Sequence, residues 1–353
     1  MSNETAGLFI RDEIASQGQA WEELIPLVME HADEIRESFA GIEEVIFTGC
    51  GSALNASLCG ASILQMQTGI SARSVPAAEC YLFRDSVFVS GRKTLAVLIS
   101  RSGKTTEVVR ALDDLRSRAI RTVGITCTED SPLARGSNLA LVLTPATERA
   151  VATTRSLTGM ILVTQLLAAI VSGSEAYLSE LRRLPELCQA QMESYHNLGK
   201  VIGERTDLTQ YAFVGNGPLF GLARESQLKV KEMVLLPVDA YPMLDFRHGP
   251  QSNVDKQMLV IAFISDSAHE EEVQFLRDMK ALGGVTWALC DRDDGTLQAH
   301  ADHVLELNSG LGELVRGPLY MPAVQYMAYY RSLSRGLNPD EPRHLSYWVD
   351  TSR

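Results

Sequence analysis

The sequence predicts an α/β protein of two domains, each built on a parallel sheet with helices on both faces. Three observations lead to this prediction. Apolar runs of strand length alternate along the chain with segments of helical spacing. In each half one such run enters a glycine turn, at Gly49 and at Gly215. Corresponding points of the two halves are separated by 215 − 49 = 166, 265 − 100 = 165 and 290 − 127 = 163 residues, which indicates an internal duplication.

In the first half, a strand and a glycine turn are followed by a helix and three more strands. The apolar residues 45–47 enter the turn at Gly49 and Gly51, and small residues follow at helical spacing over 54–67. The further strands are expected at 95–99, 122–126 and 139–143.

The second half repeats this plan, and helical segments flank both halves. Its strands are expected at 211–214, 259–264 and 285–289. Helical spacing also runs from Asp12 to Ala40 and from Ser179 to Lys200. We therefore expect an N-terminal helical arm at 1–40, a first domain at 41–175, a connecting helix at 176–205, a second domain at 206–336 and an extended tail at 337–353.

Composition agrees with two globular domains and argues against one class of partner. The chain has 353 residues, of which 45% are hydrophobic and 22% are charged, and a chain of this kind can bury two cores. Its formal net charge is -12. Because proteins meet a phosphate backbone with clustered lysine and arginine, we expect no nucleic-acid partner.

The N-terminus and the cysteines predict a soluble, cytoplasmic protein. Met1 to Glu4 lack the basic region of a signal peptide, and no run of roughly 20 apolar residues that could span a membrane occurs. The cysteines are scattered singly without a C-x-x-C pair, so we expect buried thiols rather than disulfides or a zinc site. The six are Cys50, Cys59, Cys80, Cys127, Cys188 and Cys290.

A hydroxyl-rich turn lies where the strand at 95–99 ends. Ser100, Ser102 and Thr105 precede a helix expected to start near Glu107, at the edge where parallel sheets bind ligands. Hydroxyls and backbone N–H groups at a helix N-terminus suit a tetrahedral dianion, so this turn predicts a phosphate cradle, which would hold a sulfonate in similar fashion. The alternative is an ordinary helix cap with polar turn residues.

The glycine turns also raise the question of a dinucleotide cofactor. Gly49-x-Gly51 lacks the third glycine of that fingerprint, and Gly215-x-Gly217 has Gly221 one place late. Gly51 and Ser52 instead offer a second glycine-and-hydroxyl turn beside the cradle. We therefore expect no nicotinamide, no flavin and no other cofactor.

Acid–base residues are concentrated in the second half. Glu225, Lys229 and Glu232 stand at i, i+4 and i+7 and share one helical face. The alternative for this face is a solvated set of ion pairs. Downstream, His248 lies between Phe246 and a Gly-Pro turn, where an imidazole can exchange protons. A carboxylate and an imidazole beside an anion cradle are what aldose–ketose interconversion requires.

No other catalytic apparatus is indicated. The seven histidines have no metal-ligand spacing, so we expect no metal. Neither a Gly-x-Ser-x-Gly nor a Cys/His signature is present, so a serine or cysteine nucleophile is not supported.

These residues together resemble tandem SIS (sugar isomerase) domain proteins, namely the isomerase half of glucosamine-6-phosphate synthase and its stand-alone relatives. The resemblance covers nearly the whole chain and implies two tandem flavodoxin-like SIS domains with a sugar phosphate as substrate. Its motifs are Gly49-Cys50-Gly51-Ser52, Ser100-x-Ser102-Gly103-x-Thr105, the run from Thr147 to Arg155, Glu225-x-x-x-Lys229-x-Lys231-Glu232, Arg247-His248-Gly249-Pro250 and the tail from Asn338 to Arg343.

The resemblance also implies residue roles. Glu232 would be the enediol base, with Lys229 and Glu225 orienting it and the substrate hydroxyls. His248 would open the sugar ring and would come from the neighbouring subunit, which implies a homodimer at least. The residues expected to bind substrate are Gly51, Ser52, Ser100, Arg101, Ser102, Thr105, Val151, Thr153 and Tyr347.

The chain departs from the family pattern in several places. A short helical arm opens the chain where the synthase has a glutamine amidotransferase domain, so we expect no glutamine-dependent synthesis. Tyr347 stands where the family has a lysine, which removes imine chemistry through that lysine. Arg101 and Arg155 replace a glutamine and a lysine, which suggests extra positive charge near the anion.

The expected activity is that of a phosphosugar isomerase or an aminosugar-phosphate deaminase that acts through an enediol-type intermediate. The residues of these motifs most resemble those of the branch of tagatose-6-phosphate ketose/aldose isomerases and galactosamine-6-phosphate deaminases. Two alternatives stay open: a fructosamine-phosphate deglycase, and a sugar-phosphate sensor without catalytic activity. The sugar epimer, the presence of nitrogen on C2 and the oligomer size stay open as well.

Overall fold

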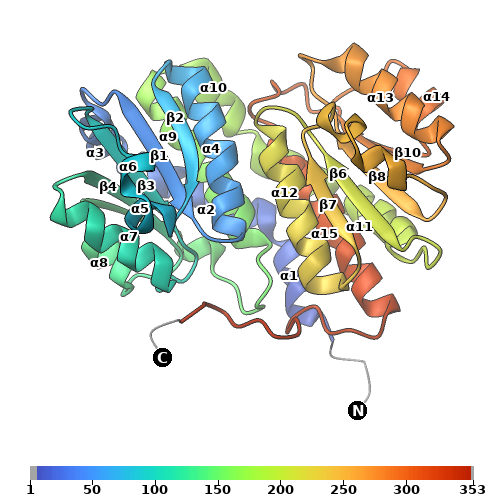
Figure 1. Ribbon diagram of the computed structural model, residues 1–353, viewed down its shortest axis with the longest axis horizontal. Coiled ribbons are helices and arrows are strands. Elements are labelled where there is room, and N and C mark those ends of the chain that lie inside the picture. Colours follow the sequence, from blue (N-terminus) through green and yellow to red (C-terminus); the bar gives the residue numbers. More distant parts are fainter. Residues whose placement is uncertain (1–5, 351–353) are drawn as a thin grey trace. The chain divides into compact units, whose positions relative to one another are not determined.

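The computed structural model describes residues 6–350, and the chain forms two compact units. The first unit consists of residues 16–186 together with the tail from Ser346. The second unit consists of the N-terminal residues up to Ala15 together with residues 187–345. Each unit contains one sheet with helices packed against it (Figure 1).

The sheet of the first unit is parallel throughout, with the strand order β2-β1-β3-β4-β5. Its strands are β1 (Glu44–Gly49), β2 (Ser71–Pro76), β3 (Thr94–Ile99), β4 (Arg121–Thr126) and β5 (Leu139–Val142). The central strands β1 and β3 are almost entirely buried. Strands covered on both faces are continuous apolar runs, which is why the sequence predicts them well.

Helices cover both faces of this sheet. One layer consists of α2 (Gln17–Met29), α3 (Ala32–Phe39), α4 (Ser52–Thr68), α9 (Arg155–Ser172) and α10 (Glu175–Leu181). The other layer consists of α5 (Glu79–Leu82), α6 (Arg84–Val87), α7 (Thr106–Ser117) and α8 (Pro132–Gly136). A short 3-10 turn, η2 (Thr144–Ala146), precedes α9.

The second unit repeats this topology. Its parallel sheet has the order β10-β9-β8-β6-β7, which corresponds strand by strand to the first sheet and is the flavodoxin-like order. The strands are β6 (Gln210–Val214), β7 (Val238–Tyr241), β8 (Met258–Phe263), β9 (Val285–Cys290) and β10 (His303–Glu306). The predicted fold class is confirmed.

Helices again flank the second sheet. One set consists of α1 (Leu8–Ala15), α11 (Leu184–Gly203), α12 (Leu219–Lys229) and α15 (Gly317–Ser334). The other consists of α13 (His269–Ala281) and α14 (Thr296–His300). Three short turns are η3 (Val230–Val234), η4 (Asp245–Arg247) and η5 (Pro250–Asn253).

Two predicted helical segments are subdivided. The N-terminal helical arm is three helices, α1 to α3, and α1 belongs to the second unit. The prediction of one helix from Ser179 to Lys200 is wrong, because α10 ends at Leu181 and α11 begins at Leu184. The hydroxyl of Ser174 accepts the Tyr177 N–H at 3.3 Å and caps α10, which gives that helix its own start.

Helix α9 is long and apolar enough, by length and composition alone, to cross a membrane. In the structure, however, 83% of its residues are buried inside the first unit. A helix that is apolar all round and covered by protein is a core helix, and α9 packs against α2 and α4 in that way.

Candidate active site

The first turn of the predicted cradle joins β1 to α4. Gly51 has φ +56°, a conformation open mainly to glycine, and α4 begins at Ser52 directly after it. The Thr153 hydroxyl donates to the Ser52 hydroxyl at 2.8 Å, so two predicted substrate-binding residues meet. In the same turn, burial raises the pKa of the Cys50 thiol to about 12, with a smaller contribution from the charge of Glu107. Cys50 is therefore a neutral thiol rather than a nucleophile at neutral pH.

The second turn of the cradle lies between β3 and α7. The Ser100 and Thr105 hydroxyls are 3.1 Å apart, and Ser100 Oγ also accepts the Gly103 N–H at 3.1 Å. The Ser102 hydroxyl accepts the Lys104 N–H at 3.1 Å. Gly103 has φ +62°, and a Cβ at this position would collide with the Ser131 side chain. The turn thus places three buried or half-buried hydroxyls at the start of α7.

Glu148 organises the segment that leads from β5 to α9, although the sequence analysis assigned it no role. Its side chain is fully buried. One carboxylate oxygen accepts the Thr154 N–H at 2.7 Å and the Thr154 hydroxyl at 2.8 Å, and the other accepts the Ser156 hydroxyl. The feature of the sequence that could have pointed to Glu148 is its position within the motif from Thr147 to Arg155.

Arg101 uses its charge within the protein rather than offering it to an anion. Its Nη1 lies 3.4 Å from Glu148 Oε2 and donates to the Ala150 carbonyl at 3.1 Å. Its Nη2 donates to the carbonyls of Val151 at 2.9 Å and Tyr347 at 3.0 Å. The expected extra positive charge at the cradle is therefore committed to Glu148, and Arg101 joins the 148–151 segment to the tail.

The tail of the chain lies along the cradle turn of the same unit. The Tyr347 ring lies under the Arg101 guanidinium, 3.8 Å from centroid to Cζ, and its hydroxyl donates to the Glu148 carbonyl at 3.2 Å. Further on, the Val349 carbonyl accepts the Thr106 N–H at 3.3 Å. Tyr347, at the position of the family's lysine, is thus held by contacts with its own unit.

Arg155, the other basic replacement, is also engaged. Its Nη1 donates to the Ser16 hydroxyl at 2.7 Å, and its Nη2 donates to the Thr147 carbonyl. Arg101 and Arg155, the two arginines that replace family residues, therefore both join segments of the first unit.

The second unit brings Glu225, Lys229 and Glu232 together, and these three residues are called the Lys229 group below. Lys229 Nζ lies 3.3 Å from Glu225 Oε1 and 2.6 Å from Glu232 Oε2. The side chains of Lys229 and Glu225 are fully buried, whereas that of Glu232 is 19% exposed. The alternative of a solvated face of ion pairs is therefore wrong.

A change of helix type places Glu232 in this group. The α-helix α12 ends at Lys229 and continues as one π-helical turn, η3, which ends at Val234 and is followed by Leu235 with φ +58°. Burial by itself lowers the pKa of Lys229, but the charges of Glu232 and Glu225 outweigh it, and the pKa is raised. Lys229 thus stays a cation beside a carboxylate that reaches the surface.

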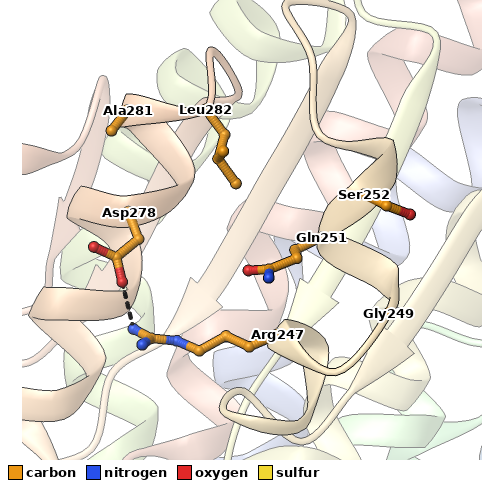
Figure 2. A pocket seen from close by; sticks show the side chains of 7 residues that line it. All are labelled: Arg247, Gly249, Gln251, Ser252, Asp278, Ala281 and Leu282. Carbon is orange, nitrogen blue, oxygen red and sulfur yellow. Dashed lines mark ion pairs between the residues drawn. The ribbon is translucent and has the colours of Figure 1, made fainter.

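His248 lies on the exposed turn between η4 and η5. The neighbouring Arg247 fastens this turn to α13, because its Nη2 lies 2.8 Å from Asp278 Oδ2 and its Cζ lies 5.7 Å from the centre of the Phe275 ring. Arg247, Asp278, Gln251 and Ser252 line an open pocket of about 640 Å³. Figure 2 shows Arg247 reaching toward Asp278, with Gln251 on η5 beside it. In the described part of the chain, His248 contacts neither Lys229 nor Glu232.

The predicted site residues thus fall into groups that can each be described in one unit. The cradle hydroxyls, Val151, Thr153, Arg101 and Tyr347 belong to the first unit, and the Lys229 group and His248 belong to the second. Within residues 6–350, no three His, Cys, Asp or Glu side chains lie together in a way that could hold a metal ion.

A family model for the SIS domain matches the chain over two segments, residues 38–170 and 209–335. The chain belongs to the SIS domain family. The two segments coincide with the two duplicated sheets, so the resemblance drawn from the sequence motifs is confirmed, and each SIS domain contains one flavodoxin-like sheet.

Known SIS relatives share most of this chain. The glutamine–fructose-6-phosphate aminotransferase of Methanothermobacter thermautotrophicus is 27% identical over 93% of this chain and 54% of its own length, so the chain spans about half the length of the curated relatives it matches. The crystal structure of tagatose-6-phosphate ketose/aldose isomerase from Escherichia coli is 23% identical, with a TM-score of 0.87 over 100% of this chain and 98% of that one. A glucosamine-6-phosphate deaminase from Thermotoga maritima is 28% identical, with a TM-score of 0.72 over 92% and 99%.

Proposed function

We propose that the chain interconverts the aldose and ketose forms of a hexose phosphate, or of its amino-sugar counterpart, through an enediol-type intermediate. The observation that carries this proposal is the Lys229 group, in which a fully buried lysine holds a partly exposed carboxylate, that of Glu232, at 2.6 Å. An isolated buried charge is costly, so a buried cation fixed on a surface carboxylate marks a group arranged for chemistry.

Glu232 is the proton carrier in this proposal. A base that moves a proton between C1 and C2 must be ionised when the substrate binds and must reach it. The Lys229 ammonium donates to Glu232 Oε2 at 2.6 Å and so fixes the orientation of the carboxylate. The π-helical turn supports this role, because such turns recur at functional sites and here bring Glu232 toward Lys229 at i+3.

The phosphate is held by the cradle of the first unit. Ser52 begins α4, and Ser100, Ser102 and Thr105 surround the start of α7. Two helix N-termini with hydroxyl donors favour a tetrahedral dianion. Gly51 and Thr153 shape and orient the first of these turns. In this proposal the phosphate group anchors the substrate, and the carbonyl end of the sugar undergoes proton transfer.

Ring opening is assigned to His248, supplied by the partner subunit of a homodimer. Its exposure on a turn at the surface of the second unit supports a role in which the ring acts outside its own unit. Imine chemistry at the tail is not part of the proposal, since Tyr347 stands in place of a lysine and its hydroxyl donates to the Glu148 carbonyl.

Hydrogen exchange at the substrate tests the role of Glu232. In deuterated water with a hexose phosphate, we expect Glu232→Gln to abolish exchange at C1 and C2, because an amide accepts no proton at neutral pH. Sugar-phosphate binding should persist, and a ligand at 100 times its dissociation constant stabilises the protein by about 2.7 kcal/mol, which a thermal shift detects.

The matched control is Glu271→Gln, which removes the same charge from an exposed position on α13. This variant should exchange at the wild-type rate. Wild-type exchange in Glu232→Gln would remove Glu232 from its proposed role. A wild-type protein that binds the sugar phosphate but catalyses no exchange would favour the sensor alternative.

Deamination of an amino-sugar phosphate is the second candidate, supported by the 28% identity to the Thermotoga maritima deaminase. An assay of ammonia release from hexosamine phosphates separates it from simple isomerisation. Release of a primary amine from a fructosamine phosphate would instead point to the deglycase alternative.

A further inference from the structure

The second unit contains a counterpart of the cradle turn. Residues 265–272 follow β8 and lead into α13, just as 100–107 follow β3 and lead into α7, and both ends are related by the same interval, 265 − 100 = 165 and 272 − 107 = 165. The first turn reads Ser-Arg-Ser-Gly-Lys-Thr-Thr-Glu and the second reads Ser-Asp-Ser-Ala-His-Glu-Glu-Glu. Both serines at the end of the strand are kept, whereas Arg101 and Lys104 are replaced by Asp266 and His269.

A carboxylate from a distant segment binds the donors of this second turn. Glu313, between β10 and α15, accepts the Asp266 N–H at 2.9 Å and the Ser267 N–H at 3.1 Å through Oε2. Its Oε1 accepts the Ser267 hydroxyl at 2.6 Å. Two backbone N–H groups and a hydroxyl at a helix start are the donor set that an oxyanion would use, and here Glu313 uses them.

A second carboxylate occupies the inner part of the turn. Glu272 is fully buried, and its Oε2 accepts the Ser265 N–H at 2.6 Å and the Ser265 hydroxyl at 3.0 Å. Its Oε1 accepts the Asn216 amide at 2.8 Å. The hydroxyl of Ser265, the counterpart of Ser100, is therefore also engaged by a carboxylate of the chain itself.

In the first unit the equivalent carboxylate has other partners. Glu313 corresponds to Glu148, since 313 − 148 = 165, and both precede the long helix of their unit. The carboxylate of Glu148 is bound instead by the Arg101 side chain and by the Thr154 N–H and hydroxyl. In the second turn Asp266 takes the place of Arg101, so this position offers Glu313 no guanidinium to pair with.

The charges on the two turns are thus reversed. Arg101 on the first turn pairs with Glu148, whereas Asp266 on the second turn pairs with Arg316 through two contacts of 2.7 Å. With the Asp266 carboxylate paired to Arg316, the N–H groups of Asp266 and Ser267 bind Glu313.

We propose that the second SIS domain retains an oxyanion-binding turn that its own Glu313 closes, so that each chain takes up phosphate only in its first domain. The ligand class of this closed turn is a tetrahedral oxyanion such as phosphate. Glu313 serves as an internal substitute for it, which leaves the second domain to supply the Lys229 group. This inference does not depend on the role of Glu232.

Counting bound phosphate per chain tests the inference. Equilibrium dialysis with radiolabelled inorganic phosphate, raised to saturation, is carried out on the full chain for the wild type and for Glu313→Ala. We expect Glu313→Ala to bind one phosphate per chain more than the wild type, because the Asp266 and Ser267 donors become free. The matched control, Glu271→Ala, removes the same charge from an exposed position on α13 and should bind as the wild type does.

A second variant keeps the test decisive if Glu313→Ala fails to fold. Glu313→Gln keeps the size of the side chain but loses its charge, so phosphate should displace it and the extra binding should appear at a higher phosphate concentration. An unchanged count in both folded variants, or two phosphates per chain in the wild type, would overturn the inference. A wild type that binds no phosphate, with one bound by Glu313→Ala, would contradict the proposed cradle instead and leave the inference intact.

Discussion

At the scale of single residues, partners decide what a charged side chain does. Arg101 and Glu148 are both nearly or fully buried. Besides the contact between them, Arg101 donates to backbone carbonyls, and Glu148 accepts from the Thr154 N–H and from the Thr154 and Ser156 hydroxyls. A buried pair of this kind adds little compared with apolar packing, but the loss of one partner leaves the other charge uncompensated. The same holds for Lys229 between its two carboxylates.

Removal of the Arg101 charge should loosen the tail as well as destabilise the first unit. We expect Arg101→Met to destabilise the protein by about 3 kcal/mol, because Glu148 stays buried without its cation. The Tyr347 carbonyl and ring lose their contacts at the same time. Urea unfolding measures the first effect, and limited proteolysis in the tail measures the second.

The control for this prediction is Arg110→Met, an exposed arginine on α7. This variant should unfold at the same urea concentration as the wild type, and its tail should stay resistant to proteolysis. Equal behaviour of Arg101→Met and Arg110→Met would mean that the tail is held by other contacts.

At the scale of elements, local context explains both the successes and the failures of the sequence analysis. The buried central strands are continuous apolar runs and were predicted. Three strands were missed, namely β2, β7 and β10, and all lie at sheet edges. Their residues include exposed or polar positions, as in Ser71–Pro76 and Val238–Tyr241. An edge strand is paired on one side only, so its apolar pattern is weak.

The turn that carries His248 depends on α13. We expect Asp278→Asn to speed amide hydrogen exchange about two- to five-fold at Arg247 and His248, since a half-exposed ion pair contributes about 0.2–1 kcal/mol locally. The His248 N–H is a suitable reporter because it donates to the Asp245 carbonyl at 2.9 Å. Overall stability should change little.

Glu270→Gln is the matched control, since it removes one charge from an exposed position on the same helix. Exchange in the His248 turn should then be that of the wild type. If Asp278→Asn also leaves exchange unchanged, Phe275 and the backbone of the turn are sufficient to hold it.

At the scale of the whole molecule, the two SIS domains share one topology but differ in the charged residues at their corresponding turns. Corresponding points of the two halves lie 163 to 166 residues apart, and this duplication, evident in the sequence, led to the predicted fold. The proposed assembly, a homodimer that supplies His248 across its interface, is a property that one chain by itself does not display.

Mixed oligomers test that assembly. Glu232→Gln and His248→Ala proteins, each inactive alone, are unfolded together and refolded. If His248 acts in the neighbouring subunit, half of the sites in each mixed dimer are intact, and about a quarter of the wild-type activity should return. If His248 acts in its own chain, every site in the mixture carries one defect, and the activity should stay at the level of the separate variants.

The sequence by itself determined the fold class, the duplication and the positions of the buried strands, and it predicted the hydroxyl-rich turns and the shared helical face of Glu225, Lys229 and Glu232. These follow from local patterns, since apolar runs, glycine turns and helical spacing act over a few residues. The tertiary structure alone decided that Arg101 holds Glu148 and the tail, that a π-helical turn carries Glu232, and that Glu313 covers the second turn. Each of these depends on which distant groups meet a charge once water has been excluded, and chain spacing does not encode that choice.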